Sequence, residues 1–205
     1  MEKGIALLSG GIDSPVSIHK VSDRMEIIAV HFHQQAITDG TEIEKVKQLA
    51  IILKLKKVLL VPFTPTFTAL ASKCNHKDYY ILGKIAMLTC AQLIAKDENA
   101  KFLITGENLG QVSSQTLSNL TTITSFIDTP ILRPVLAYDK QETINIAKLI
   151  GTYETSKGPE LCCLLGPKDP STKSTKANLE KELSKINLLN LCQDAIKNME
   201  IVNLN

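Results

Sequence analysis

Short apolar runs rich in β-branched residues alternate along the chain with longer stretches in which apolar residues recur every three or four positions. The short runs predict strands, and the longer stretches predict amphipathic helices. The predicted strands are residues 4–9, 26–33, 57–63, 102–106 and 130–135. The predicted helices are residues 15–24, 41 to about 55, 78–96, 111–124 and 140–150, with a terminal helix from about residue 177.

Several residues mark where these helices begin and end. Pro15 suits the first position of a helix, where its missing N–H is not needed. Thr41 and Glu44 have the spacing of a capping box. Gly151 follows the helix at 140–150 and is typical of a helix stop.

Strands separated by helices predict βαβ units, and therefore a mostly parallel sheet with helices on both faces. We expect a three-layer αβα fold with a parallel five-stranded sheet. Such sheets bind ligands at the carboxyl ends of their strands. The residues to examine are those that follow each strand, namely 9–14, 31–35, Thr64, 106–110 and 136–139.

A chain of 205 residues favours one compact domain with a sizeable core. We expect the α/β domain to occupy residues 1–176, including a loop at 156–176 that is rich in Gly, Pro and Lys. Residues 177–205 are expected to form a helical tail packed on the same domain, with packing on a second subunit as the alternative.

Charge and cysteine content narrow the class of protein. The formal net charge of +2 permits a nucleic-acid partner but lacks the strong basic excess of a stand-alone binder. The N-terminus resembles neither a signal peptide nor a membrane span, so we expect a cytoplasmic protein without a membrane partner. Five irregularly spaced cysteines fit a reducing compartment.

The glycine-serine turn, residues 9–14, follows the first predicted strand and precedes a helix. Its chemistry-bearing residues are Ser9, Gly10, Gly11, Asp13 and Ser14. A turn of this kind directs backbone N–H groups and a helix dipole at one point, which favours an anion. It lacks the lysine of the G-x-x-x-x-G-K-[ST] loop. The Asp13 carboxylate fits a Mg²⁺ ligand beside phosphates, an organiser of the loop amides, or a helix N-cap.

The string Ser9-Gly10-Gly11-x-Asp13-Ser14 resembles the signature of the PP-loop ATP pyrophosphatases, which have an adenine nucleotide alpha hydrolase-like fold. Together with "ITGENLGQVSSQTL", "TPILRPVLAYDKQETINIAKLIGTYETS" and "CCLLGPKDPSTK", it resembles the catalytic domain of the ThiI family of tRNA 4-thiouridine synthetases, which is linked with thiamine biosynthesis. The resemblance covers most of residues 4–176. It implies a tRNA sulfurtransferase that uses ATP and Mg²⁺: uridine 8 of tRNA is adenylated, and a cysteine persulfide then delivers sulfur.

The resemblance also implies which residues bind ATP. They are Leu7, Leu8, Ser9, Gly10, Gly11, Asp13, Ser14, His31, Phe32, Lys84, Gly106 and Gln115. By pattern alone, Leu7 and Leu8 are more typical of core residues of a strand than of a binding site. The chain departs from the family at Lys84, which stands where the family has an adjacent arginine pair; a lysine lacks the bidentate fork of arginine. Glu107 and Asn108 follow a strand and support the site, or Asn108 caps a helix.

The resemblance assigns the sulfur-carrying cysteine to Cys162, with a register ambiguity of one residue. We expect Cys163 to resolve it by forming a disulfide with Cys162, or to serve in a second transfer. Cys74, Cys90 and Cys192 fall within or beside helical patterns, which is typical of buried cysteines. An iron–sulfur centre is the alternative role for the adjacent pair, although no C-x-x-C motif supports it. A metal pair at His31 and His33 lacks a third ligand nearby in sequence.

The resemblance implies partners as well. The chain begins at its first predicted strand, without the THUMP region of full-length relatives. We therefore expect tRNA binding through a separate THUMP-type protein or a homodimer, with a smaller substrate as the alternative. Sulfur would come from an external donor, a cysteine desulfurase or another persulfide carrier. The alternatives are an amidating PP-loop ligase and a non-catalytic ATP-binding subunit.

Overall fold

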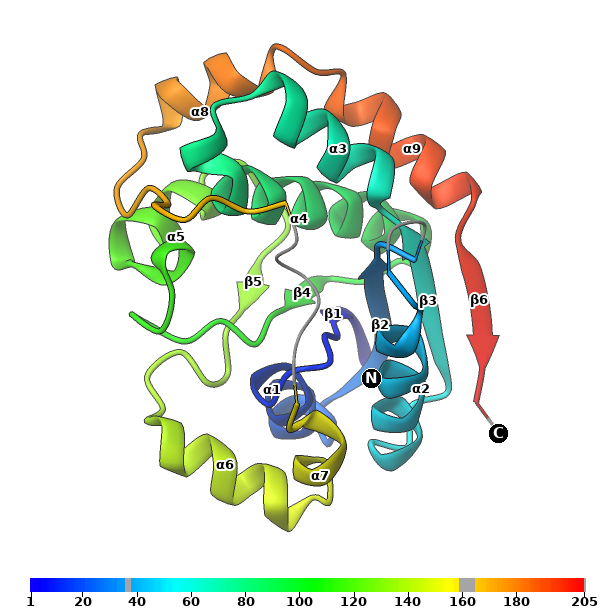
Figure 1. Cartoon of the computed structure of the whole chain (residues 1–205). Coiled ribbons are helices and arrows are strands. Elements are labelled where there is room, and N and C mark those ends of the chain that lie inside the picture. The colour runs from blue at the N-terminus through cyan, green and yellow to red at the C-terminus, as the bar shows by residue number, and fades with distance from the viewer. Residues whose placement is uncertain (36–37, 159–164, 205) are drawn as a thin grey trace.

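The computed structural model describes residues 1–35, 38–158 and 165–204, and these form a six-stranded sheet between two layers of helices (Figure 1). The strands are β1 (Glu2–Leu7), β2 (Met25–His33), β3 (Lys57–Pro62), β4 (Phe102–Ile104), β5 (Ile131–Leu132) and β6 (Glu200–Asn203). They lie in the order β5-β4-β1-β2-β3-β6. The first five are parallel, and β6 pairs antiparallel with β3. The predicted αβα fold is confirmed, with β6 as a strand that the pattern did not predict.

Helices cover both faces of the sheet. They are α1 (Asp13–Val21), α2 (Thr41–Ile52), α3 (Thr64–Lys73), α4 (Tyr79–Asp97), α5 (Leu117–Thr124), α6 (Lys140–Leu149), α7 (Tyr153–Ser156), α8 (Lys176–Leu183) and α9 (Leu188–Lys197), with 3-10 turns η1 (His76–Asp78) and η2 (Ser113–Gln115). Figure 1 shows α3, α4, α5, α8 and α9 on one face and α1, α2, α6 and α7 on the other.

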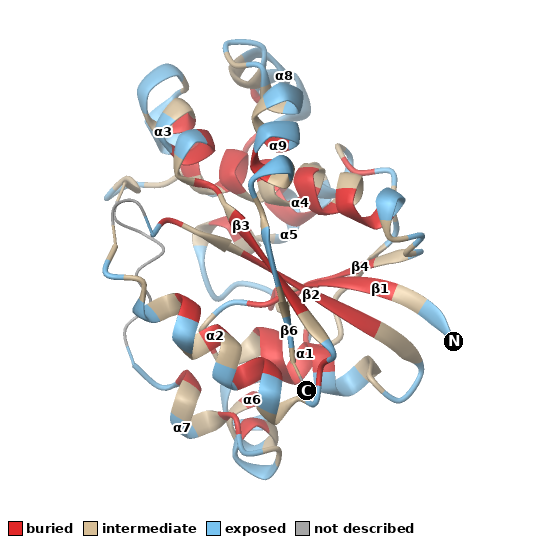
Figure 2. Ribbon diagram, turned by 90° about the vertical axis from the view of Figure 1, so that its right-hand side faces the viewer, coloured by how far each residue is buried: buried red, intermediate tan, exposed pale blue. Residues whose placement is uncertain are grey.

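Successive strand residues divide the core into two layers, because strand side chains alternate between faces. Ile5 is opposite Ile28 in the register of β1 and β2, and both belong to the apolar cluster that includes α4. Ala6 faces the other way and packs with Val46 of α2. Both faces of the central strands are therefore buried, as Figure 2 shows. This explains why the strand sequences are almost continuously apolar.

The structure corrects several predicted helix starts. Asp13, not Pro15, begins α1, and its cap residue Ile12 makes no side-chain capping bond, so Asp13 is not an N-cap. The predicted capping box at Thr41 is wrong: Gly40 precedes α2 with φ 77°, and the Thr41 hydroxyl donates to Asp39 at 2.7 Å.

A capping box does occur elsewhere, at the start of α6. There Asp139 accepts from the backbone N–H of Glu142 at 2.7 Å, and Glu142 accepts from the backbone N–H of Asp139 at 2.8 Å. Gly151 follows α6 with φ 77°, so the predicted stop is confirmed.

Two predicted elements are shorter than expected. The helix predicted at 111–124 begins only at Leu117, after η2, because the Thr116 side chain caps it by accepting from the Asn119 N–H at 3.2 Å. The strand predicted at 130–135 is reduced to β5, since Pro130 and Pro134 flank it and proline has no N–H for the ladder.

The pattern missed α3, α7 and β6. In α3 the buried apolar residues are Phe67 and Leu70 alone, and two positions are too few to give a helical periodicity in the sequence. The C-terminal segment packs on the sheet domain: Leu179, Cys192 and Ala195 lie in the cluster that includes α4. The division at residue 176 stays a prediction. Over the described residues, no helix has both the length and the apolar character needed to cross a bilayer.

The sheet order places a topological switch at β1, which pairs with β2 on one side and with β4 on the other. The connections after β1 and β4 therefore diverge to opposite faces, and the carboxyl ends of these two strands leave space for a ligand.

Candidate active site

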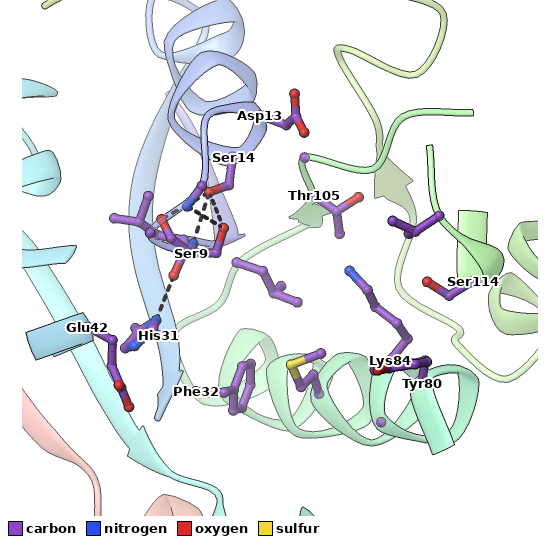
Figure 3. Close-up of a pocket in the computed structure, with 18 of the residues that line it drawn as sticks. Ser9, Asp13, Ser14, His31, Phe32, Glu42, Tyr80, Lys84, Thr105 and Ser114 are labelled. Atoms are coloured by element: carbon purple, nitrogen blue, oxygen red, sulfur yellow. Dashed lines mark hydrogen bonds between the residues drawn. The ribbon is translucent and has the colours of Figure 1, made fainter. Parts of the chain in front are cut away.

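The glycine-serine turn is held in shape by its own serine hydroxyls. The backbone N–H of Ser9 donates to Ser14 Oγ at 2.9 Å, and the backbone N–H of Gly11 donates to Ser9 Oγ at 3.2 Å (Figure 3). The two hydroxyls lie 3.1 Å apart. The turn leads directly into α1, whose first backbone N–H groups and dipole favour an anion. The serines thus organise the turn from within.

Gly106 is required where β4 ends, because the start of α1 presses against it. A Cβ at this position would lie 2.5 Å from the backbone N of Ser14 and 2.8 Å from the carbonyl carbon of Asp13. Such distances are not tolerated between a side chain and a backbone. We expected Gly106 to admit a ligand; in the structure it admits the glycine-serine turn, and so joins the ends of β1 and β4.

His31, near the end of β2, is buried and neutral. Its Nδ1–H donates to the Leu8 carbonyl at 2.9 Å, since a carbonyl only accepts. Burial lowers the pKa of His31 to about 4 despite that bond. Its Nε2 is buried and has no hydrogen-bond partner among the described residues, so in this tautomer it is an unused acceptor. The pKa of His33 is also lowered by burial.

A cavity of about 1010 Å³, the main cavity, opens at the carboxyl ends of β1, β2 and β4. All twelve residues expected to bind ATP line it: Leu7, Leu8, Ser9, Gly10, Gly11, Asp13, Ser14, His31, Phe32, Lys84, Gly106 and Gln115. The volume suffices for a nucleotide. Their convergence is observed, while the role of each as an ATP ligand stays a prediction.

A buried ion cluster supports the side of the main cavity formed by α4. Glu107 is 1% exposed; its Oε2 accepts from Arg133 Nε at 2.8 Å, and its Oε1 lies 3.8 Å from Lys84 Nζ. The Thr105 hydroxyl adds a bond of 3.1 Å. Burial alone would raise the pKa of Glu107, but Lys84 and Arg133 outweigh it and hold the pKa below its usual value.

The ion cluster directs Lys84 into the main cavity, where Figure 3 shows its side chain extending toward Thr105. Arg133 does not line the cavity; it pairs with Glu107 and donates to Thr124 Oγ1 at 2.9 Å. Glu107 therefore supports the site. Asn108 neither caps a helix nor lines the main cavity, since its amide donates to the Tyr138 carbonyl at 2.6 Å.

Sequence reasoning missed three lysines that line the main cavity, Lys45, Lys140 and Lys157. Lys45 of α2 lies over the glycine-serine turn, where a Cβ on Gly10 would meet its Cδ at 3.0 Å, and its Nζ donates to the Ser156 carbonyl at 3.1 Å. Lys140 Nζ lies 3.9 Å from Asp13 Oδ2. Lys140 follows a predicted strand end by a few residues and was detectable, whereas nothing in sequence links Lys45 to the turn.

Cys162 and Cys163 lie outside the described residues. The described residues around them, Gly158 on one side and Pro167 and Lys168 on the other, line the main cavity. Cys90 and Cys192 are buried, as expected, and Cys74 is partly buried. Cys90 Sγ donates to the Cys192 carbonyl at 3.9 Å. Hydrogen bonding with Cys192 and burial raise the pKa of the Cys90 thiol, which makes it inert.

Asp13 fits the requirements of Mg²⁺, which is commonly held by one or two carboxylates together with substrate phosphates. Its carboxylate lines the main cavity beside the turn. Over the described residues no three His, Cys, Asp or Glu side chains gather in a cluster suited to a metal ion. Asp13 and Glu42 are the described carboxylates that line the main cavity.

Gln115 Oε1 belongs to a residue that lines the main cavity; this oxygen is buried and has no hydrogen-bond partner within the described part of the chain.

A family model described as thiamine biosynthesis protein (ThiI) matches residues 1–188. The chain belongs to the ThiI family. A probable tRNA sulfurtransferase from Acetivibrio thermocellus is 38% identical over 98% of this chain and 53% of its own length. This ThiI-family chain thus spans about half the length of the curated relatives it matches.

Solved structures agree with this assignment. A 4-thiouridine synthetase solved in complex with RNA and bound ATP is 33% identical, with a TM-score of 0.94 over 100% of this chain and 55% of that one. An NMN synthetase from Francisella tularensis, 15% identical with a TM-score of 0.60 over 96% of this chain and 84% of that one, shares the fold alone. The fold of the ThiI-family chain is therefore that of the PP-loop ATP pyrophosphatases.

Proposed function

We propose that the chain is the catalytic part of an ATP-dependent tRNA sulfurtransferase that makes 4-thiouridine at position 8 of tRNA. The observation that carries the proposal is the convergence of all twelve expected nucleotide-binding residues on one cavity in a member of the ThiI family. The solved relative with bound RNA and ATP supports both substrates.

In the proposed first step, the O4 oxygen of uridine attacks the α-phosphorus of ATP, and pyrophosphate leaves. The glycine-serine turn and the start of α1 bind the pyrophosphate part through backbone N–H groups. Lys45, Lys84 and Lys140 supply positive charge around it. Mg²⁺, held by Asp13 and the phosphates, would neutralise charge that the lysines leave uncompensated.

In the proposed second step, the terminal sulfur of a persulfide on Cys162 attacks C4 of the base, and AMP leaves. Cys163 then attacks Cys162 to break the sulfur–sulfur bond, which leaves a Cys162–Cys163 disulfide and sulfur on the base. An external thiol reductant supplies two electrons to restore both thiols. The cavity-lining positions of Gly158 and Pro167, which flank these cysteines in sequence, support assigning the step to this segment.

The proposal includes three partners besides tRNA. A cysteine desulfurase or another persulfide carrier loads Cys162, a THUMP-type RNA-binding protein presents the tRNA, and a second copy of the chain is a further means of widening the RNA surface. Adding each component separately to the reaction measures how much activity depends on it.

The test incubates the chain with ATP, Mg²⁺, a persulfide donor and unmodified tRNA, and measures 4-thiouridine by absorbance together with pyrophosphate and AMP. Cys162→Ala is expected to lose 4-thiouridine while pyrophosphate release continues. Cys74→Ala, which changes a partly buried thiol elsewhere, is the matched control. Full activity of Cys162→Ala would remove this residue from the mechanism.

Two other outcomes favour other functions. Product formed with ammonia and unaffected by thiol blockers would indicate an amidating PP-loop ligase. ATP binding without pyrophosphate release, even with a THUMP-type protein present, would indicate a non-catalytic nucleotide-binding subunit.

A further inference from the structure

A second, shallower space of about 460 Å³, the side hollow, opens beside the main cavity. Its lining residues are Asn108, Leu109, Gly110, Gln111, Tyr138, Asp139 and Lys140. Gln111 and Lys140 line both spaces, so the two adjoin each other. We propose that the side hollow binds the acceptor pyrimidine base of the RNA, a proposal that rests on the function proposed above.

The position of the side hollow meets the geometric requirement of the adenylation step. The attacking oxygen must come within about 3–3.5 Å of the phosphorus, so the acceptor base has to lie directly beside the phosphates. Lys140 of the side hollow lies 3.9 Å from Asp13 of the glycine-serine turn. A base in the side hollow is therefore adjacent to the phosphate end of the main cavity, opposite the wall that includes His31 and Phe32.

The lining has the mixed chemistry that an unpaired base needs. Leu109, the aliphatic side chain of the lining, is 48% exposed. Exposed apolar side chains offer contact to the face of a base. The Gln111 amide carries both a donor and an acceptor, which match N3–H and O4 at the edge of uracil.

Other polar groups of the side hollow are already used to fix its shape. Asn108 donates to the Tyr138 carbonyl at 2.6 Å, and the Asp139 carboxylate accepts from the Glu142 N–H at 2.7 Å. The backbone N–H of Leu109 donates to the Leu136 carbonyl at 2.9 Å. The side hollow is thus preformed. It presents to a ligand the Gln111 amide and the exposed ammonium group of Lys140, which lies 3.9 Å from Asp13.

Two lysines near the side hollow favour an RNA acceptor over a neutral small molecule, since the one carboxylate of its lining, Asp139, is engaged in capping α6. Lys140 is exposed at its edge, and Lys20 Nζ lies 5.6 Å from the centre of the Tyr138 ring. Both ammonium groups suit the phosphates that flank an RNA base. These positive charges suit a nucleotide that is part of a larger RNA and is displaced from its fold, because such a base has phosphates on both sides.

Product RNA provides a direct test, because 4-thiouridine cross-links to neighbouring protein groups under long-wave ultraviolet light. A tRNA with 4-thiouridine at position 8 is irradiated with the full chain and AMP, and the cross-linked peptides are mapped by mass spectrometry. Cross-links within residues 106–112 or 138–140 are expected. Their absence there, in a preparation that thiolates tRNA, overturns the proposal.

Variants supply a second measurement. Leu109→Ser is expected to raise the KM for tRNA roughly tenfold, equivalent to about 1.4 kcal/mol, with the Kd for ATP unchanged. Leu189→Ser on α9, at 50% exposure, is the matched control. Gln111→Ala, an exposed change, tests the side hollow if Leu109→Ser unfolds. An unchanged KM in both variants also overturns the proposal. A wild-type chain that neither releases pyrophosphate nor thiolates tRNA contradicts instead the proposed function.

Discussion

The two walls of the main cavity obtain their shape from different forces. On the wall formed by the glycine-serine turn, small residues allow backbone segments to touch, and neutral groups make the bonds: serine hydroxyls, backbone amides and an uncharged His31. On the wall formed by α4, a buried carboxylate, Glu107, holds two cations in place. The first wall depends on close approach, and the second depends on charge balance. Four changes test this difference.

The largest effect is expected from Glu107→Gln, which removes the charge at the centre of the ion cluster. Arg133 and Lys84 are then left partly buried without a counterion, and losing one partner of a buried pair costs about 3–5 kcal/mol. The measurement is the free energy of unfolding in urea. The control is Asp194→Asn, which breaks the exposed ion pair between Asp194 and Lys197, whose charged atoms lie 3.8 Å apart. This change should alter the free energy of unfolding by less than about 0.5 kcal/mol. Equal effects would show that the α4 wall does not depend on charge.

Gly106→Ala tests close approach on the other wall. The new Cβ would lie 2.5 Å from the Ser14 backbone N, so β4 and α1 must separate, at an expected cost of about 3 kcal/mol and with loss of ATP binding. Gly10→Ala is the matched change in the same turn: its Cβ meets only the flexible Lys45 side chain at 3.0 Å, which can move aside. The free energy of unfolding in urea compares the two variants, and calorimetric titration with an ATP analogue measures binding to Gly106→Ala. If Gly10→Ala destabilises the chain as much as Gly106→Ala does, the contact of Gly106 with α1 is not critical.

The neutral state of His31 predicts how stability depends on pH. Its pKa is about 4 in the folded protein against 6.5 ordinarily, so between these values the unfolded chain binds more protons. The contribution of neutral His31 to the free energy of unfolding is therefore nearly complete above pH 6.5, and it is lost as the pH drops toward 4. The expected loss from His31 is about 2 kcal/mol between about pH 7 and about pH 5.

Denaturant unfolding at the two pH values measures this loss. His31→Asn keeps a donor for the Leu8 carbonyl but does not titrate, so its loss over the same range should be smaller by that amount. The same pH dependence in both proteins would assign it to another group.

The smallest effect is expected from Lys45→Met, since Lys45 reaches the glycine-serine turn from a third side, α2. Losing one charged contact to a phosphate should raise the Kd for ATP roughly tenfold, or about 1.4 kcal/mol. Lys47→Met is the control, because Lys47 pairs with Glu44 at 2.9 Å and does not line the main cavity. If Lys45→Met raises the Kd for ATP more than Gly106→Ala does, charge rather than backbone shape dominates ATP binding at the glycine-serine turn.

The sequence predicts the first wall better than the second for a physical reason. A turn built from Ser9, Gly10, Gly11 and Ser14 depends on local backbone geometry. Residues that are adjacent in sequence determine that geometry, so the sequence predicts it. Glu107 pairs with Lys84 and with Arg133, and each partner lies more than twenty positions away in sequence. No local spacing of residues therefore predicts these pairs. The same is true of Lys45, which reaches the turn only because α2 packs beside α1.

The fold follows the same rule. Parallel strands buried on both faces leave continuous apolar runs, so β1 to β4 were predictable to within a few residues. β6 has the pattern of an edge, with one partly buried residue, Val202, among exposed ones. Its place beside β3 depends on tertiary pairing, which the pattern of hydrophobic residues does not reveal.

β6 also covers the edge of β3 and so protects the sheet from pairing with other protein chains. The outermost strand of a sheet offers unpaired backbone groups to any other chain and is a common starting point for aggregation. β6 runs antiparallel along β3 through pairs from Lys57–Asn203 to Leu60–Glu200 and shields that margin, while β5 at the opposite margin is only two residues long. A chain truncated before residue 200 would bare a long apolar strand, and we expect it to precipitate even where its catalytic chemistry is intact.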